Sequence, residues 1–221
     1  MLVKTKGIVF RLTPYGDTSV IVNVFTDQFG LQSYIVNGVR SQTKTSKVAL
    51  FQPLTLLEMV VYHKGHGGIM RIKEVKCYHL YQNLSQQVNK SAIALFINEI
   101  LNKAVKDQTH TAELFEFIAN SMMILDTHPK PENFHLIFLL GLSRHLGFAP
   151  NHTHEVLGVH WMDEQEEKLL EHLLRMDYQS EISLTYPQRQ ILLSSLIRFY
   201  QTHIDGFGEL KSLPVLQEVL R

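Results

Sequence analysis

The segment VIVNVFT, residues 20–26, decides the fold class of the first part of the chain. Its three valines fall on one side of a strand, and Ile21 and Phe25 fall on the other, because strand side chains alternate with a period of two. Both sides are largely apolar, which is typical of a barrel wall covered on its outer side. The segment therefore predicts a buried strand of a small β domain.

Four more strand candidates flank this segment. Turn residues such as Pro14, Gly16 and Gly30 separate them, and a long polar connection covers residues 37–53. The candidates are Val3–Leu12, which Gly7 should break, and Leu31–Val36, Leu54–Tyr62 and Ile69–His79. Five short strands in about 80 residues are typical of an oligonucleotide-binding (OB) barrel. An SH3-like barrel would give much the same pattern.

After Leu84 the apolar period changes from that of strands to that of helices. We expect Ser85 to cap the first helix, Thr111 to cap the second, and Gly147 to end a buried central helix. The predicted helices are 85–106, 111–125, 132–145, 163–175, 188–203 and a short one after Pro214, with residues 151–162 irregular. The fold class is therefore α+β with two domains, a five-stranded barrel over 1–80 and an all-α helical domain over 81–221.

The net charge of zero hides two opposite blocks. Residues 1–80 hold ten Lys/Arg and four Asp/Glu, a net charge of +6, and residues 81–221 hold eleven and seventeen, a net charge of −6. No acidic residue lies between Asp27 and Glu58. A basic block of this kind favours a polyanionic partner, although a solvated basic loop would look the same.

Composition excludes several classes of protein. An apolar fraction of 45% excludes a disordered chain, and no run approaches the 18 apolar residues of a membrane helix. The single cysteine, Cys77, excludes an internal disulfide and any cysteine-based zinc site. With no leader-like start, we expect a cytoplasmic protein that is not associated with membranes.

No catalytic motif is present. The sequence has no GxxxxGK[ST], GxGxxG or GxSxG segment, and Cys77 lies in a predicted strand, where an inert thiol is expected. His152, His154 and His160 share one segment, and such a group could chelate a metal. Chance clustering among twelve histidines explains them better. We therefore expect no enzyme, no cofactor and no metal.

The residues typical of nucleic-acid binding form a clearer pattern than those of catalysis or metal binding. Phosphates form a line of charge, so their contacts need Lys and Arg spread over a surface, and single strands also need aromatic platforms. The candidate DNA-binding residues are Lys4, Lys6, Arg11, Tyr15, Arg40, Lys44, Lys47, Arg71 and Lys73. Among the other aromatic residues, Tyr34 is also a candidate platform, whereas Phe10 and Phe25 are better explained as barrel core. Tyr15 lies in a predicted turn, where we expect it to be exposed.

Several segments together resemble one known family. The opening KTKGIVFR (4–11), YGD (15–17) and FTDQFG (25–30) is followed by NGVR (37–40) and FQPL (51–54). The second domain adds LGFAP (146–150) and LKSLPVL (210–216). In order and spacing these segments resemble the bacterial RecO family over nearly the whole chain.

The resemblance implies an OB barrel followed by a helical domain, and a non-enzymatic role in recombinational DNA repair. RecO proteins bind single- and double-stranded DNA and anneal complementary strands. They bind the C-terminal tail of the single-strand-binding protein SSB, and the partner RecR, and help to load RecA onto SSB-coated strands in the RecFOR pathway. The resemblance thus implies a bacterial, nucleoid-associated protein.

The chain departs from the family pattern at the place of a zinc site. Many relatives carry a four-cysteine zinc site after the Phe-Ala-Pro turn, where this chain reads NHTHEVL (151–157), so we expect packing in place of zinc.

The SSB tail is acidic with an apolar end and needs an apolar pocket rimmed by cations. The candidate protein-binding residues of the helical domain are Arg144, Arg175, Arg189, Arg198 and Lys211.

Two alternatives remain open. The barrel could bind another protein, with its basic residues adding only solubility, which would make the chain an interaction adaptor. The segment containing His152, His154 and His160 could instead serve a metal-dependent hydrolase.

Overall fold

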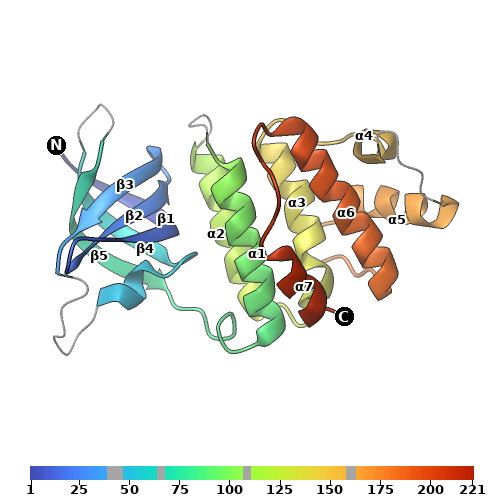
Figure 1. The fold of residues 1–221 in the computed structure, drawn as a ribbon, viewed down its shortest axis with the longest axis horizontal. Helices are drawn as coiled ribbons and strands as arrows, with labels where there is room; N and C mark the ends of the chain where they lie inside the picture. The colour runs from blue at the N-terminus through green and yellow to red at the C-terminus, as the bar shows by residue number, and fades with distance from the viewer. Residues whose placement is uncertain (39–46, 64–67, 107–110, 158–162) are drawn as a thin grey trace. The chain divides into compact units, whose positions relative to one another are not determined.

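The computed structural model describes residues 1–38, 47–63, 68–106, 111–157 and 163–221. In these ranges the chain forms a closed five-stranded barrel followed by seven α-helices (Figure 1). The predicted α+β class and the predicted barrel are confirmed.

The barrel consists of strands in the order β1-β2-β3-β5-β4. The strands are β1 (Leu2–Tyr15), β2 (Ser19–Thr26), β3 (Gly30–Val36), β4 (Leu56–Tyr62) and β5 (Met70–His79). A short 3₁₀ helix, η1 (Lys47–Phe51), precedes β4. All neighbouring strands pair antiparallel except β3 and β5, which pair in parallel.

Gly7 does not break the first strand, and that prediction was wrong. β1 continues through Gly7, which pairs with Thr26 on one side and Leu57 on the other. A Cβ placed at Gly7 would meet the Val24 side chain and lie 2.7 Å from Met59 Cε. The glycine is therefore required by the close approach of the barrel interior and does not mark a turn.

The barrel interior is a largely apolar core. Its fully buried members include Val22, Val24, Tyr34, Leu57 and Met59. The predicted valine alternation in β2 is confirmed, since Val20, Val22 and Val24 all belong to this core. Phe10 and Phe25 are also buried and stack with their ring centroids 5.6 Å apart, as expected for core residues.

The helices follow the predicted periodicity closely. They are α1 (Val88–Ala104), α2 (Thr111–Thr127), α3 (Phe134–His145), α4 (Thr153–Leu157), α5 (Glu164–Leu174), α6 (Tyr186–His203) and α7 (Leu213–Val219), with a 3₁₀ turn η2 (Pro131–Asn133) before α3. Asp163 caps α5 in a capping box with Glu166. Helix α3 is buried along most of its length, as predicted for a central helix.

Two predictions for this region were wrong. Ser85 does not cap α1, which begins three residues later at Val88. The segment 151–162, expected to be irregular, contains the short helix α4, which buries Val156.

The chain divides into two compact units. The barrel unit comprises Met1–Tyr81 and Val105–Met122, and the helical unit comprises Gln82–Ala104 and Met123–Arg221. Most of α2, from Thr111 to Met122, thus groups with the strands, where Thr111 Oγ1 donates to the carbonyl of Asp27 at 3.1 Å. The domain boundary near residue 80 stays a prediction.

Candidate nucleic-acid interface

Strand register places several candidate residues on one outer face of the barrel unit. Across β1, β2, β3 and β5, Thr13 pairs with Ile21, Ile21 with Ile35, and Ile35 with Arg71. Their neighbours Val22 and Tyr34 belong to the barrel core, so this row faces outward. Arg71 therefore continues a row that begins on β1.

Arg11 and Tyr15 lie on the same outer face. Arg11 pairs with Asn23, which pairs with Ser33, and Tyr15 pairs with Ser19 at the end of the β1–β2 hairpin. Arg11 and Arg71 are exposed, and 53% of the Tyr15 surface is exposed. We name this surface the arginine face and define it by Arg11, Tyr15 and Arg71.

Lys73 lies next to the arginine face. The β4–β5 register shifts between Val60 and Val61, so that Ile72 and Glu74 are paired and Lys73 is the extra residue of a bulge. Its Nζ lies 3.8 Å from Glu74 Oε1, and both side chains are well exposed. An exposed pair of this kind contributes little stability, so Lys73 can exchange Glu74 for another anion.

Lys4 and Lys6 lie on the outer surface of β1, β4 and β5, where the next outward row joins Leu2 and Tyr62 to Arg71. Lys6 pairs with Glu58, which pairs with Lys76, and Lys76 Nζ lies 2.7 Å from Glu58 Oε2. The hydrogen bond and charge of Lys76, with the charges of Lys4 and Lys6, hold the pKa of Glu58 below its usual value. We name this surface the lysine face and define it by Lys4, Lys6, Lys76 and Glu58.

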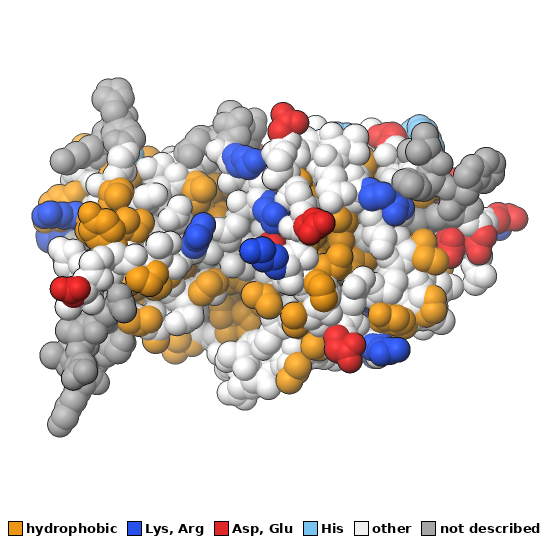
Figure 2. Space-filling view, viewed as in Figure 1, with side chains coloured by type: hydrophobic (Ala, Val, Ile, Leu, Met, Phe, Trp, Pro, Cys, Tyr) orange, Lys and Arg blue, Asp and Glu red, His pale blue; other side chains and the backbone are white. Residues whose placement is uncertain are grey.

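The two faces differ in charge pattern. The lysines of the lysine face surround a carboxylate, and Lys6 Nζ also lies 5.5 Å from the centre of the Tyr78 ring. The guanidinium groups of the arginine face have the hydroxyl, amide and alkyl side chains of strands β2 and β3 as register neighbours. In the view of Figure 2, Lys and Arg alternate with Asp and Glu and form no single continuous patch.

The remaining barrel candidates are a mixed group. Arg40 and Lys44 lie outside the described residues, and so does the side chain of Lys47, whose backbone begins η1. Tyr34 is completely buried in the barrel core, and burial raises the pKa of its phenol to about 12. Tyr34 therefore offers no surface on which a base could stack.

The structure separates the five cationic candidates of the helical unit. Arg144 and Arg175 line the same hollow of about 640 Å³, together with His152, His154 and Leu174. Arg144 Nη2 donates to the carbonyl of Leu174 at 2.7 Å, and Arg175 Nη2 lies 2.8 Å from Glu171 Oε1. Of the five, these two are the pair that one hollow brings together.

The other three lie apart. Arg189 is buried, and it donates to Asn133 Oδ1 and to the carbonyls of Leu220 and Leu184. Arg198 is half-buried and donates to the hydroxyl of Ser195. Lys211 is exposed beside Ser212, at the start of α7.

A second hollow, of about 760 Å³, has a more apolar lining. Phe134 and Tyr178 stack in it with ring centroids 4.3 Å apart, and Ile137 and Ile182 also line it. Its rim carries Lys130, whose Nζ lies 3.5 Å from Glu181 Oε1. We name it the Phe134 hollow.

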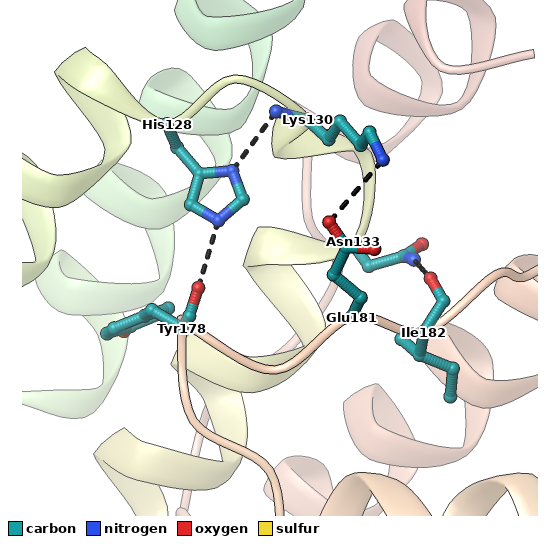
Figure 3. Close-up of polar contacts among 6 residues, drawn as sticks. All are labelled: His128, Lys130, Asn133, Tyr178, Glu181 and Ile182. Carbon is teal, nitrogen blue, oxygen red and sulfur yellow. Dashed lines mark hydrogen bonds and ion pairs between the residues drawn. The ribbon is translucent and has the colours of Figure 1, made fainter.

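Hydrogen bonds fix the walls of the Phe134 hollow. His128 Nε2 contacts the carbonyl of Tyr178 at 3.0 Å, and Asn133 Nδ2 donates to the carbonyl of Ile182 at 2.8 Å (Figure 3). Sequence reasoning missed Lys130. The signal that could have found it is the sequence Pro129-Lys130-Pro131, which places a cation in the break between two helices.

The zinc site of many RecO proteins does not fit the residues present here. Segment 151–157 supplies two histidines, which stack with ring centroids 5.4 Å apart, and the single cysteine lies far along the chain, in β5. His160 lies outside the described residues. Within the described ranges, no three His, Cys, Asp or Glu side chains are grouped so as to hold a metal ion.

In the part of the chain that the structure describes, no helix is both long enough and apolar enough to cross a bilayer.

Comparison with known proteins gives a consistent result. A family model described as "Recombination protein O N terminal" matches residues 1–81, and one described as "Recombination protein O C terminal" matches residues 85–160. A curated DNA repair protein RecO from Flavobacterium psychrophilum is 38% identical over 236 residues, covering 99% of each chain. RecO proteins of Christiangramia forsetii and Bacteroides fragilis are each 34% identical, again over 99% of both chains.

Proposed function

The chain belongs to the RecO family of DNA repair and recombination proteins, and from this premise we propose that it is a recombination mediator. In this proposal it binds single- and double-stranded DNA and anneals complementary strands. With RecR, it helps to load RecA onto single-stranded DNA coated by SSB. It acts by binding and positioning, and catalyses no reaction itself. Binding to DNA would keep it on the bacterial nucleoid.

One observation carries the DNA-binding part of the proposal. Arg11, Tyr15 and Arg71 point outward from the two strands that flank β2 and β3, in a barrel whose first 80 residues have a net charge of +6. OB barrels bind oligonucleotides over strands 2 and 3 and the adjoining loops, and the residues of the arginine face border that surface on both sides. The guanidinium groups would hold the phosphates, and Tyr15 would stack on a base.

Annealing follows from the same contacts. Two complementary strands repel each other through their phosphates, and cations that neutralise phosphates lower that repulsion. Contacts to the backbone leave base edges available for pairing. The expected contributions of Arg40, Lys44 and Lys47, and of Lys73 beside the face, extend this phosphate track.

We place the SSB tail in the Phe134 hollow. An apolar tail end would lie beside the stacked rings of Phe134 and Tyr178, and an acidic residue would replace Glu181 as the partner of Lys130. The exposed Lys130–Glu181 pair costs little to exchange. Buried Arg189 lines the same hollow and adds positive charge beneath it.

The test of DNA binding compares the two barrel faces. Fluorescence anisotropy of a labelled single-stranded oligonucleotide is measured over a salt series for the wild type, for Arg11→Glu/Arg71→Glu and for the matched control Lys4→Glu/Lys6→Glu. Neutralising about three to six phosphates gives a log–log salt slope of roughly −2 to −4. The arginine-face variant should lose about tenfold or more in affinity, and the control clearly less.

The outcomes separate the candidate functions. Equal losses in both variants would assign DNA to both faces, and unchanged binding in the arginine-face variant would contradict the proposed site. Absence of salt-sensitive DNA binding by the wild type would favour the adaptor. A labelled SSB-tail peptide tests the second site, where Lys130→Glu should abolish binding and Arg175→Glu, in the other hollow, should not.

A further inference from the structure

The seam between β3 and β5 opens into a hollow beside the arginine face. The two strands run parallel and pair at Tyr34 with Met70 and at Ile35 with Arg71. Beyond these pairs the described parts of the strands separate, and a hollow of about 510 Å³ lies between them. This volume is within the roughly 300–1,000 Å³ typical of ligand sites.

The lining of this seam hollow is apolar at its floor. Phe51 of η1 is completely buried and closes the base. The other apolar residues of the lining are half-buried, so their remaining surface faces the hollow or solvent: Ile35, Val36, Leu50, Ile72 and Val75. Such a floor suits a flat group with apolar faces.

The rim of the seam hollow carries two cations and one carboxylate. Arg71, Lys73 and Glu74 all line it and are exposed, and Lys73 has only a weak pairing with Glu74 at 3.8 Å, which a phosphate can replace. Asn37 lies at the end of β3, where its Oδ1 accepts a hydrogen bond from Ser19 Oγ at 3.1 Å. The site therefore combines an apolar floor with Arg71, Lys73 and the exposed carboxylate of Glu74 at its mouth, an excess of one positive charge.

We propose that the seam hollow takes one unstacked base of a DNA single strand, with Arg71 and Lys73 holding the phosphates on either side. This inference rests on the proposed DNA-binding function and adds a reason for strand preference. A base in a single strand exposes its faces, whereas duplex bases remain stacked on their neighbours. The hollow would thus admit single strands and exclude intact duplex.

Continuity with the arginine face favours a nucleic acid over a peptide. Arg71 belongs both to the outer row of β1, β2, β3 and β5 and to the rim of the hollow. A strand lying over Arg11 and Tyr15 therefore reaches the hollow without leaving the barrel surface. An acidic peptide with an apolar side chain has similar chemistry, and it is made an outcome of the test.

The experiment uses two variants of the full chain at one exposed position. Asn37→Trp places a bulky ring at the mouth of the hollow, and Asn37→Ala removes the same hydrogen bond to Ser19 while leaving the hollow open. Binding is measured for an oligothymidylate and for an abasic oligonucleotide with the same number of phosphates. Thermal melting of both variants establishes that they are folded.

Wild type and Asn37→Ala should prefer the oligothymidylate over the abasic strand by about tenfold, the size of effect expected from one well-stacked base. Asn37→Trp should lose most of this preference while keeping its affinity for the abasic strand. Equal preference in Asn37→Trp and Asn37→Ala would overturn the base site.

Two further results keep the inference separate from the proposed function. If the wild type binds neither oligonucleotide in a salt-sensitive way, the DNA-binding proposal itself fails. If an acidic peptide with a terminal aromatic residue competes with DNA, and Asn37→Trp but not Asn37→Ala removes that competition, the hollow is a protein site and the base assignment is wrong.

Discussion

Different interactions stabilise the interior of the barrel unit and the interior of the helical unit. The barrel interior is packed by valine, leucine, methionine and aromatic side chains, and its tightest constraint is steric, at Gly7. The helical unit buries charged side chains, such as Asp126, Lys90 and Arg189. Each of them forms hydrogen bonds with backbone groups that are distant in sequence. The barrel should therefore respond mainly to changes of volume, and the helical unit to changes of charge.

The largest expected effect is at Asp126 near the end of α2. Its carboxylate is 2% exposed and accepts hydrogen bonds from the backbone N–H groups of Gln82, Asn83 and Leu84 at 2.7–2.9 Å. Burial raises its pKa, but these three donors and the charge of Lys90 outweigh burial, so the pKa lies below its usual value.

We expect Asp126→Ala to lower the free energy of unfolding by about 4 kcal/mol, since hydrogen bonds to charged groups contribute about 1.5–3 kcal/mol each and are not additive. Asp126→Asn is the control, because it keeps one acceptor oxygen, and should lose about half as much. Urea unfolding followed by circular dichroism measures both. A loss below about 1 kcal/mol for the alanine variant would contradict the importance of this anchor.

In the barrel the matching prediction is Gly7→Ala. The added Cβ would collide with Val24 and Met59 in the packed interior, and overpacking of this kind costs about 1–3 kcal/mol. Val24→Ala removes one of the two colliding side chains, so the control is Gly7→Ala in that background, where the added methyl should cost less. Denaturant midpoints compare the two backgrounds, and an equal loss in both would contradict the steric role of Gly7.

Acid should weaken the helical unit through His135. This side chain on α3 is completely buried, neither ring nitrogen has a hydrogen-bond partner among the described residues, and burial, with the charge of Arg189, lowers its pKa to about 3. In the unfolded chain the pKa is about 6.5. Below pH 6.5 the unfolded state therefore binds the additional proton, and stability falls as the pH falls from 6.5 towards 3.

At pH 5 this loss amounts to about 2 kcal/mol relative to neutral pH. His135→Leu removes the titrating group and should flatten the dependence of stability between pH 7 and pH 5. Urea unfolding at several pH values measures it. The carboxyl groups of Asp126 and Glu99 also have lowered pKa values, and protonating them would lower stability too, but only at more acidic pH. They therefore contribute little to the change in stability between pH 7 and pH 5. An equally steep loss in His135→Leu would assign the acid sensitivity to another group.

The same contrast explains which parts of the molecule the sequence could predict. Alternation in β2 and the apolar period of α3 are local patterns, so both elements and the buried valines were predicted correctly. Gly7 was misread because its role depends on Val24 and Met59, which are distant in sequence. Lys130 was missed for a similar reason, because the apolar side chains below it come from two separated segments.

The candidate DNA-binding residues show that alternation along one strand cannot predict which residues of other strands lie beside them. Alternation puts Lys4 and Lys6 on one side of β1, but the neighbouring carboxylate of Glu58 comes from β4, through a register that alternation cannot supply. Alternation would also put Arg71 and Lys73 on one side of β5, whereas a bulge at Lys73 interrupts the β4–β5 ladder. The outward row that starts on β1 reaches Arg71 only because β3 pairs with β5.

The smallest expected effect is at Tyr34, which places a hydroxyl in the otherwise apolar side-chain cluster of the barrel core. The Tyr34 hydroxyl is buried with no hydrogen-bond partner among the described residues. Tyr34→Phe removes a group whose burial is uncompensated, so the free energy of unfolding should stay within about 0.5 kcal/mol or rise by up to about 1 kcal/mol. Differential scanning calorimetry measures the change, and the mutation leaves the DNA affinity of the arginine face unaltered because Tyr34 points to the interior. A loss above about 1 kcal/mol would mean that the hydroxyl has a stabilising partner, such as a buried water, and that the barrel too depends on a buried polar contact.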